Sequence, residues 1–392
     1  MTPLLTRPIR LLQRADRAVG QWTGRRRVLV DAHTPVNVAM AAPIFRAMQR
    51  DPRVEFFWTS SQERDRLGSI YAHAGALHVV HPSRAALMRF DAYLASDFTW
   101  AWLPRGVCRI QMFHGVAGKY GFDAPAESMR QWDRLLFVNE RRLRNFVQSG
   151  AVDATSSAIR LVGMPKVDCV VDGTFKRTDV LAELGLDPAL PTILYAPTRS
   201  PESSLNAFGL DLVRLLQSLP INVVVKLHDR QRDLRVPFSG GVDWVAALQP
   251  LLNDRTVLAG NADISRYLVA ADVMITDHSS AGFEFLLCDR PLVRIHRPTL
   301  IAKANIHRDY VALLASASES VDAPAGAVAA VERALAAPRE RSSRRREVAR
   351  DLFYRPGSAT ARAVKEVYEA IALEPLGATA DSAQEVACPQ SL

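Results

Sequence analysis

Short apolar runs alternate with amphipathic stretches between residues 27 and 150. The runs predict strands at 28–30, 54–58, 77–80, 92–95, 110–113 and 135–138. Stretches with apolar residues at helical spacing predict helices at 38–50, 62–74 and 139–149. Short apolar strands that alternate with helices are typical of a parallel sheet covered on both faces.

A second series of the same kind begins after about residue 175. It predicts strands at 192–195, 222–226, 256–258, 273–276 and 292–295, and helices at 206–219, 263–271, 280–287 and 325–337. Gly163, Pro165 and Gly173 interrupt regular structure, so we expect a domain boundary near 165–178. The pattern therefore predicts two α/β halves of similar size.

The two ends of the chain differ from this pattern. Residues 1–27 contain seven arginines and one acidic residue, Asp16, with apolar residues between them at helical spacing. A basic amphipathic helix at 1–26 suits an anionic membrane surface, but it can equally pack on the body of the protein. The arginines interrupt any apolar core, which argues against a signal peptide.

The last part of the chain is again strongly charged and then polar. Residues 339–350 contain six arginines and two glutamates, which predicts a solvated helix. Ser358 is expected to cap a further helix at 359–372, and the small polar residues from 374 to 392 predict a disordered tail. No apolar run reaches the roughly 18 residues needed to span a bilayer.

Composition and charge narrow the possible classes of protein. The 392 residues are 48% hydrophobic and 23% charged, which is ordinary for a soluble globular protein of two or three domains. The net charge is +8, of which 1–27 carry +6 and 339–350 carry +4, leaving −2 for the rest. A near-neutral body argues against a broad nucleic-acid-binding face. Four cysteines without CxxC spacing exclude a disulfide scaffold or a zinc ribbon.

Polar residues directly after strands are the first candidates for a site, because ligands bind beyond the carboxyl ends of strands in doubly wound sheets. His114 and Gly115 follow the strand at 110–113, and Lys119 comes five places after the histidine. A neutral imidazole accepts a proton near pH 7, glycine admits close backbone approach, and lysine suits phosphate. The alternative is a histidine that bonds a backbone carbonyl in a turn.

Two loops in the second half offer groups for phosphate. Pro197, Thr198 and Arg199 follow one strand, and the hydroxyl and guanidinium there can hold a phosphate, although a loop without function fits equally well. Lys226 and His228 are two residues apart, so we expect them on one side of their strand. Their burial requires a partner, which is either a ligand phosphate or a local carboxylate.

The turn Asp277-His278-Ser279-Ser280 leads from a strand into a helix. Ser279 and Ser280 lie at the expected helix start, where free backbone amides and the helix dipole attract anions such as a diphosphate. Glu284 is four residues after Ser280 and can bind ribose hydroxyls. The alternative is simple N-capping by serine.

Taken together and in order, these motifs resemble the CDP-glycerol:poly(glycerophosphate) glycerophosphotransferase family, which builds teichoic acids and related capsule polymers. The matching segments are His114-Gly115 with Lys119, the turn at 163–168, Tyr195 to Thr198, Lys226 with His228, Asp277 to Ser280, and Arg290-Pro291. The sequence departs from the family's usual motifs at Val116-Ala117, Lys166, Asp229 and His278.

The resemblance implies an α/β fold with two Rossmann-like domains of the glycosyltransferase-B type. The implied parts are an acceptor-side domain at 27–170, a nucleotide-binding domain at 171–357, and a helix at 358–373 that crosses back to the first domain. It implies transfer of a glycerol-phosphate group from CDP-glycerol, or from a related CDP-alditol, to a hydroxyl of a glycan or polymer acceptor, with release of CMP.

The resemblance also implies roles for the site residues. His114 would deprotonate the acceptor hydroxyl, and His228 would act with it in catalysis by stabilising the diphosphate. The implied substrate-binding residues are Gly115, Lys119, Pro197, Thr198, Arg199, Lys226, Asp277, His278, Ser279, Ser280 and Glu284. No metal and no cofactor are expected.

Two other functions remain open at this stage. A nucleotide-sugar glycosyltransferase or epimerase on the same fold would share the anion site at the helix start. A nucleic-acid-binding protein is supported by the charge alone, and we expect no nucleic-acid partner. The expected location is the cytoplasmic face of the cell membrane, held peripherally by residues 1–26.

Overall fold

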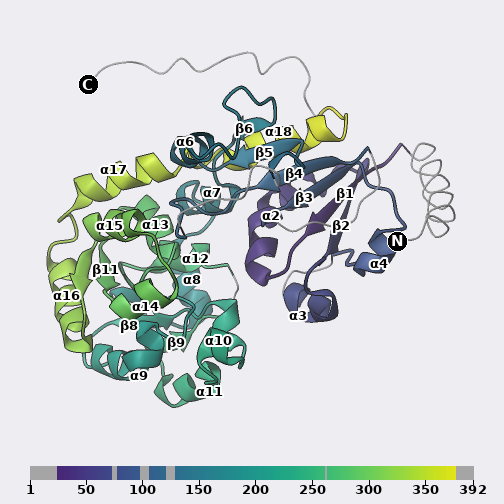
Figure 1. Cartoon of the computed structure of the whole chain (residues 1–392). Coiled ribbons are helices and arrows are strands. Elements are labelled where there is room, and N and C mark those ends of the chain that lie inside the picture. Colours follow the sequence, from purple (N-terminus) through teal and green to yellow (C-terminus); the bar gives the residue numbers. More distant parts are fainter. Residues whose placement is uncertain (1–23, 73–76, 98–105, 121–128, 261–262, 377–392) are drawn as a thin grey trace.

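Two parallel sheets, each covered by helices on both faces, form the two halves of the molecule (Figure 1). The computed structural model describes residues 24–72, 77–97, 106–120, 129–260 and 263–376. Most of the predicted N-terminal helix and of the predicted disordered tail lies outside these ranges. No helix within them combines the length and apolarity needed to cross a bilayer.

The first sheet has the strand order β2-β1-β3-β4-β5-β6. Its strands are β1 (Arg26–Asp31), β2 (Val54–Thr59), β3 (Ala92–Ala95), β4 (Cys108–Met112), β5 (Arg134–Phe137) and β6 (Ile159–Leu161). The helices of this half are α2 (Pro35–Met48), η1 (Arg64–Arg66), α3 (Leu67–Tyr71), α4 (Pro82–Ala85) and α6 (Glu140–Gln148). Residues 28–30 of β1 and all of β3 are buried, as their continuous apolar residues require.

The second sheet has the order β12-β11-β10-β7-β8-β9. Its strands are β7 (Thr192–Tyr195), β8 (Asn222–Val225), β9 (Thr256–Leu258), β10 (Val273–Thr276), β11 (Leu292–Ile295) and β12 (Glu319–Val321). The helices from α8 to α16 are α8 (Arg177–Leu184), α9 (Ser204–Leu216), η3 (Asp229–Arg232), α10 (Val236–Ser239), α11 (Trp244–Leu248), η4 (Gln249–Leu251), α12 (Ser265–Ala270), α13 (Ala281–Phe285), η5 (Leu286–Cys288), α14 (Pro298–Lys303), α15 (Arg308–Ser316) and α16 (Pro324–Ala336).

Edge strands account for the errors in the predicted sheets. The strand expected at 77–80 is reduced to one parallel bridge between Val79 and Trp58, because Val79 is exposed and has no strand beyond it. β6 and β12 were not predicted, since each has only three residues and no continuous apolar run. With the bridge at Val79 included, both sheets follow the strand order of a Rossmann-like domain.

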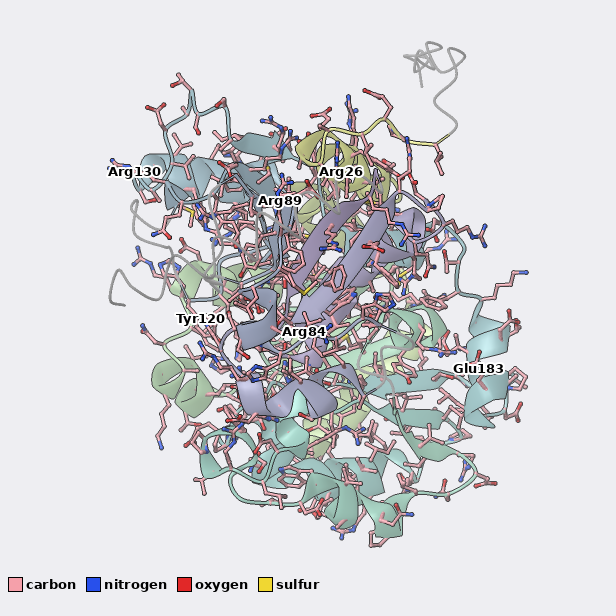
Figure 2. The ribbon with its side chains drawn as sticks, turned by 90° about the vertical axis from the view of Figure 1, so that its right-hand side faces the viewer. Arg26, Arg84, Arg89, Tyr120, Arg130 and Glu183 are labelled. Atoms are coloured by element: carbon pink, nitrogen blue, oxygen red, sulfur yellow. The ribbon has the colours of Figure 1, made fainter. Side chains whose placement is uncertain are left out.

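The chain crosses between the halves twice, and the turned view of Figure 2 shows the halves one above the other. The first crossing includes η2 (Pro165–Val167) and α7 (Asp168–Val171). The second follows α17 (Ser342–Leu352) and leads into α18 (Ala359–Ala370), which packs against α2 of the first half.

Helix α17 is not simply the solvated helix that its charge predicted. Arg345 in α17 is 2% exposed, because its guanidinium donates to the Asp289 carboxylate and to the backbone carbonyls of Pro338, Glu340 and Asp289. Each of the three guanidinium nitrogens therefore has an acceptor, which makes the burial of this arginine tolerable.

The carboxylate of Asp168 holds the start of α18. It accepts backbone hydrogen bonds from Gly357 (2.7 Å), Ala359 (3.2 Å) and Thr360 (2.6 Å). The prediction that the Ser358 side chain caps this helix is wrong, because its hydroxyl makes no capping bond. Asp168 comes from the other crossing and satisfies the free amides from outside the helix.

Gly163 allows the two crossings to touch. Its φ of +87° lies in the left-handed region, and an added Cβ would lie 2.5 Å from the backbone oxygen of Tyr354. A residue with a side chain would therefore push the second crossing away from the first.

We predict that Asp168→Ala lowers the free energy of unfolding of the first half by roughly 2 kcal/mol, because three backbone amides lose their shared acceptor. Hydrogen–deuterium exchange should show faster exchange in α18. Ser358→Ala is the matched control and should leave α18 protection within about 0.5 kcal/mol of the parent. Equal effects of the two substitutions would contradict the assignment of the cap to Asp168.

Candidate active site

The carboxyl ends of both sheets face one cleft between the two halves. A cavity of about 110 Å³ lies there, and its wall comes from both halves and from the first crossing. The lining residues are Val36, Ala39, Lys166, Ala196, Pro197, Lys226, His228, Asp229, Ile264, Ser279, Ser280, Ala281 and Glu284. Because β7 and β10 mark the point where the strand order reverses, this is the expected place for a nucleotide.

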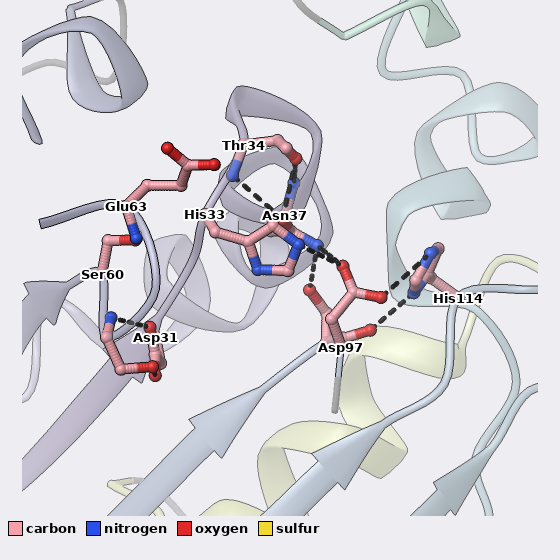
Figure 3. Close-up of polar contacts among 10 residues, drawn as sticks. Asp31, His33, Thr34, Asn37, Ser60, Glu63, Asp97 and His114 are labelled. Atoms are coloured by element: carbon pink, nitrogen blue, oxygen red, sulfur yellow. Dashed lines mark hydrogen bonds and ion pairs between the residues drawn. The ribbon is translucent and has the colours of Figure 1, made fainter. Parts of the chain in front are cut away.

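His114 lies beyond β4, on the side of the cleft formed by the first half (Figure 3). Its Nδ1 donates to the backbone carbonyl of Ser96 at 2.5 Å, so the neutral ring carries its proton on Nδ1. Nε2 lies 3.7 Å from Oδ1 of Asp97 and is left as a proton acceptor. The sequence left two alternatives for His114: a general base, or a histidine that bonds a backbone carbonyl. Both are compatible with this geometry, because the carbonyl bond uses Nδ1 and a base would use Nε2.

Asp97 lies between two groups of side chains: Figure 3 shows His33 and Asn37 on one side of it and His114 on the other. Nε2 of His33 lies 3.1 Å from Oδ2, and Asn37 donates to the same oxygen at 2.8 Å. Burial opposes ionisation of Asp97, but the hydrogen bond from His33 and the nearby His114 hold its pKa below the ordinary value. The carboxylate therefore stays charged beside both imidazoles.

His33, Asn37 and Asp97 were not predicted as site residues. His33 follows β1 and Asp97 follows β3, so the rule that identified His114 also applies to them. Asn37 carried no such signal, since it lies in the first turn of α2 and also forms the capping box with Thr34. Only the fold shows that its amide reaches Asp97.

Lys119 extends from the first half toward the second. Its backbone carbonyl accepts from the amide of His307, and its Nζ lies 5.8 Å from the ring centroid of Tyr310. Burial and Arg199 lower the pKa of Lys119 to about 8, although Asp277 opposes the shift. The ammonium is therefore charged at pH 7 and lies among groups of the second half.

His228 is a neutral donor in this environment. Burial, followed by Arg199 and Lys226, lowers the pKa of His228 to about 3. Its Nδ1 accepts from the backbone N–H of Arg230 at 3.1 Å, which places the ring proton on Nε2. His228 also lines the cavity, so this N–H is available to a ligand phosphate.

Lys226 lies past the strand on which we expected it, because β8 ends at Val225. Its Nζ donates to the carbonyl of Leu227 at 2.5 Å. Burial lowers the pKa of Lys226 to about 8, and Asp229 opposes this change. Lys226 and His228 nevertheless both line the cavity, as two residues of one loop.

In the loops after β7 and β10, side-chain oxygens of each loop accept hydrogen bonds from backbone amides of the other. Oδ2 of Asp277 accepts from the amides of Thr198 (3.1 Å) and Ser204 (3.2 Å), and burial raises its pKa. The hydroxyl of Thr198 accepts from the amide of His278 at 3.0 Å. These bonds give Asp277 and Thr198 a positioning role in this structure, behind Ser279, which lines the cavity.

The ring of His278 lies behind this turn. It is fully buried and does not line the cavity. Burial, Arg294 and Lys119 lower the pKa of His278 to about 3, and the ring packs edge-on against His296.

Gly115, the residue after His114, leaves its backbone open. An added Cβ at this position would meet nothing within 4 Å.

Glu284 and Lys166 form a buried ion pair in the cavity wall. Nζ of Lys166 lies 2.5 Å from Oε2 of Glu284, and both side chains are about 6% exposed. Burial alone would lower the pKa of Lys166, but Glu284 and Asp263 raise it above the ordinary value. Lys166 thus links the first crossing to α13 of the second half.

The residues that the structure describes include no group of three or more His, Cys, Asp or Glu side chains that could hold a metal ion. The chemistry available in the described cleft consists of a proton-accepting histidine, a shared carboxylate, and several cations and N–H groups around the cavity.

Comparisons with known proteins place these features in a family. The family model for CDP-glycerol:poly(glycerophosphate) glycerophosphotransferase matches residues 37–369. No curated protein matches the chain significantly.

Solved structures resemble the whole two-domain arrangement. The wall teichoic acid polymerase TagF aligns over 91% of this chain and 93% of its own, with a TM-score of 0.69 and 16% identity. A putative UDP-N-acetylglucosamine 2-epimerase from Listeria monocytogenes aligns over 88% and 96%, with a TM-score of 0.58 and 14% identity. MnaA from S. aureus, solved with UDP, aligns over 89% and 98%, with a TM-score of 0.57 and 13% identity.

These likenesses confirm the predicted fold of two Rossmann-like domains of the glycosyltransferase-B type. The family model matches residues 37–369, which is most of the chain, and this match identifies the family as well as the fold. The protein belongs to the CDP-glycerol:poly(glycerophosphate) glycerophosphotransferase family and is a transferase of the CDP-glycerol glycerophosphotransferase type.

Proposed function

We propose that the protein transfers glycerol phosphate from CDP-glycerol to a hydroxyl of a glycan or polymer acceptor and releases CMP. The observation that carries this proposal is the tautomer of His114: Nδ1 donates to Ser96, which leaves Nε2 as a proton acceptor 3.7 Å from Asp97, while Lys226, His228 and Ser279 line the cavity of the cleft. A base and an anion site on opposite sides of one cleft are what transfer of a phosphoryl group to a hydroxyl requires.

The reaction begins with proton transfer to His114. Nε2 takes the proton of the acceptor hydroxyl as its oxygen attacks the glycerol-bearing phosphorus of CDP-glycerol. The new bond joins the acceptor oxygen to that phosphorus, and the bond to the CMP phosphate breaks. Asp97, 3.7 Å from Nε2, stabilises the imidazolium that forms, and His33 and Asn37 hold the carboxylate in place.

Lys119 of the first half and several donors of the second half would balance the negative charge on the phosphate oxygens. The N–H on Nε2 of His228 and the guanidinium of Arg199 would bind the diphosphate and the departing CMP, with Thr198 positioned beside them. Ser279 and Ser280 offer hydroxyls at the cavity wall. These donors are fixed before the reaction, which is the main source of stabilisation in such transition states.

The acceptor is proposed to be associated with an anionic membrane surface. Residues 1–27, with seven arginines against Asp16, would hold the enzyme there peripherally on the cytoplasmic face. This fits a role in assembling teichoic-acid-like or capsule polymers of the cell envelope.

A nucleotide-sugar enzyme is the second candidate, supported by the fold shared with the epimerase structures. Thermal shifts with CDP, UDP and GDP ligands separate the two, because a ligand at 100 times its Kd stabilises by roughly 2.7 kcal/mol. CMP release from CDP-glycerol with a membrane-bound acceptor then tests the proposal directly. Absence of release from both CDP-glycerol and CDP-ribitol would contradict it.

We predict that His114→Ala lowers kcat by on the order of 10²- to 10⁴-fold, because the acceptor hydroxyl loses its general base. The Kd for CDP-glycerol should stay within about threefold, since His114 lies outside the cavity wall. CMP release and isothermal titration measure the two quantities. His81→Ala, which removes an exposed histidine in α4's cap, is the control and should leave both unchanged. Full turnover by His114→Ala would exclude this histidine as the base.

We also predict that affinity for CDP falls as the pH rises above about 8. The pKa of Lys119 is about 8 in the free protein, and a bound diphosphate favours the charged ammonium, so the pKa rises on binding. Binding is therefore independent of this group below pH 8 and weakens above it, by up to about tenfold per pH unit.

Titration calorimetry between pH 7 and 10 measures this dependence. Lys119→Arg keeps the charge and should remove about one proton from the pH slope, leaving the part due to Lys226. Lys303→Arg, at an exposed lysine paired with Glu202, is the matched control. The same slope in Lys119→Arg and in the parent protein would show that Lys119 does not contact the diphosphate.

A further inference from the structure

A second cavity lies at the end of the second sheet that is opposite the cleft. Its volume is about 1150 Å³, and its wall includes Pro191, Asp272 and Pro291, which directly precede β7, β10 and β11. The cavity in the cleft lies beyond the carboxyl ends of β7 and β10. Among the described residues none lines both cavities, so the larger one is separate from the candidate active site.

Positive charge is in excess on the wall of this second cavity. Its described lining residues include two aspartates and five arginines, which are Arg177, Arg290, Arg339, Arg341 and Arg346. The formal charge of these lining side chains is therefore +3. A cavity with this charge attracts anions.

The two carboxylates of the wall are already shared with arginines. Asp272 pairs with Arg177 at 3.1 Å. Asp289 accepts from the buried Arg345 at 3.1 Å and lies 3.4 Å from Arg346. Because Asp289 serves two guanidinium groups, the excess of positive charge falls on the remaining three lining arginines.

The start of α17 adds backbone donors to the same wall. Ser342 and Ser343 begin this helix of 11 residues, and both line the cavity. In the described part of the chain no side chain caps the helix, and its first turn holds no acidic residue. Arg341, directly before it, lies 3.8 Å from Glu340 at an exposed contact that contributes little. Free amides at a helix start beside guanidinium groups suit a phosphate.

The remaining wall and the size of the cavity narrow the kind of ligand. Leu190, Pro191, Pro291, Leu335 and Pro338 give the cavity an apolar side. A volume of about 1150 Å³ holds far more than one phosphate group. The ligand expected here therefore carries phosphate on a larger, partly apolar body.

The orientation of the cavity favours a soluble ligand over a bilayer. The cavity lies at the amino ends of β7 and β10, and the cleft lies at their carboxyl ends. A bilayer against the cavity would leave the cleft on the far side of the sheet. The acceptor, however, is proposed to reach the cleft from a membrane surface.

Helix α17 connects this cavity to the loop that carries His114. It runs from the second half to α6 of the first half (Figure 1). The carbonyl of Leu352, its last residue, accepts from the side-chain amide of Asn139 at 2.7 Å, and the same nitrogen donates to the carbonyl of Val116 at 2.9 Å. Val116 is two residues after His114, so one amide group joins the end of α17 to the loop of the base.

We propose that this second cavity is a regulatory site for a soluble phosphate-bearing compound. A phosphate group bound by Arg339, Arg341 and the start of α17 neutralises like charges and fixes that end of the helix. Through α17 and Asn139 it then orders the loop of His114. The effect on turnover rests on the proposed transfer of glycerol phosphate, whereas binding to the cavity does not.

Isothermal titration with inorganic pyrophosphate tests the site, using the full chain with saturating CDP so that the nucleotide cavity is filled. The parent is compared with the double variant Arg339→Gln/Arg341→Gln. We expect the variant to bind pyrophosphate at least about 10-fold more weakly, because two charged donors are lost. At saturating CDP-glycerol, pyrophosphate should raise kcat for CMP release on the order of fivefold in the parent and leave kcat of the variant unchanged.

The double variant Arg333→Gln/Arg344→Gln is the matched control. It removes two charges from α16 and α17 at residues that pair with Glu319 and Glu347 and do not line the cavity. Its Kd for pyrophosphate should stay within about threefold of the parent value. Equal weakening in the two double variants would overturn the site, because the effect would then follow net charge alone.

Sedimentation with phosphatidylglycerol vesicles separates a soluble ligand from a lipid headgroup. The two double variants should bind these vesicles equally well. Loss of vesicle binding in Arg339→Gln/Arg341→Gln alone, with no binding of pyrophosphate by the parent, would overturn the soluble ligand and assign these arginines to a membrane surface.

Two further outcomes separate the regulatory role from the proposed function. Pyrophosphate binding at the cavity that leaves kcat of the parent unchanged would overturn the regulatory role. Failure of the parent protein to release CMP from any CDP-alditol would refute the proposed function itself, and the pyrophosphate titration would still decide whether the cavity is a binding site.

Discussion

Three backbone N–H groups at the start of α18 donate to one carboxylate, that of Asp168, and this contact fixes how the two halves meet. Two residues earlier in the same turn, Lys166 binds Glu284 of α13. One short turn thus holds the helix that returns to the first sheet and the helix that begins beyond β10. Lys166 and Glu284 themselves line the cavity, so its wall depends on this turn.

The sequence predicted the two-sheet fold well, because buried parallel strands are short continuous apolar runs such as those of β1 and β7. It failed at the edges, where β6, β12 and Val79 have a neighbour on one side only and need less apolar surface. Strand pairing there is decided by the rest of the sheet rather than by the local residues.

The candidate site could be predicted in part for a related reason. His114, Thr198, His228 and Ser279 each follow a strand, and position along the chain was enough to find them. The sequence did not predict the partners of these residues that come from another helix or loop. Asp168 rather than Ser358 caps α18, Lys166 binds Glu284, and Asn37 donates to Asp97. Such pairings arise from tertiary distance, which no local pattern encodes.

Helix α18 also has a consequence for how the chain folds as it is made. Its buried residues Ala363 and Val367 face the first half, where Tyr368 donates to Asp51 and Arg26 donates to the carbonyl of Ile371. The ribosome completes β6 at Leu161 but supplies α18 only after the whole second domain, which takes roughly 10 to 40 seconds at 5 to 20 residues per second. During that interval the first domain lacks part of its cover and exposes apolar surface. The nascent chain is therefore most dependent on chaperones while the second domain is being synthesised.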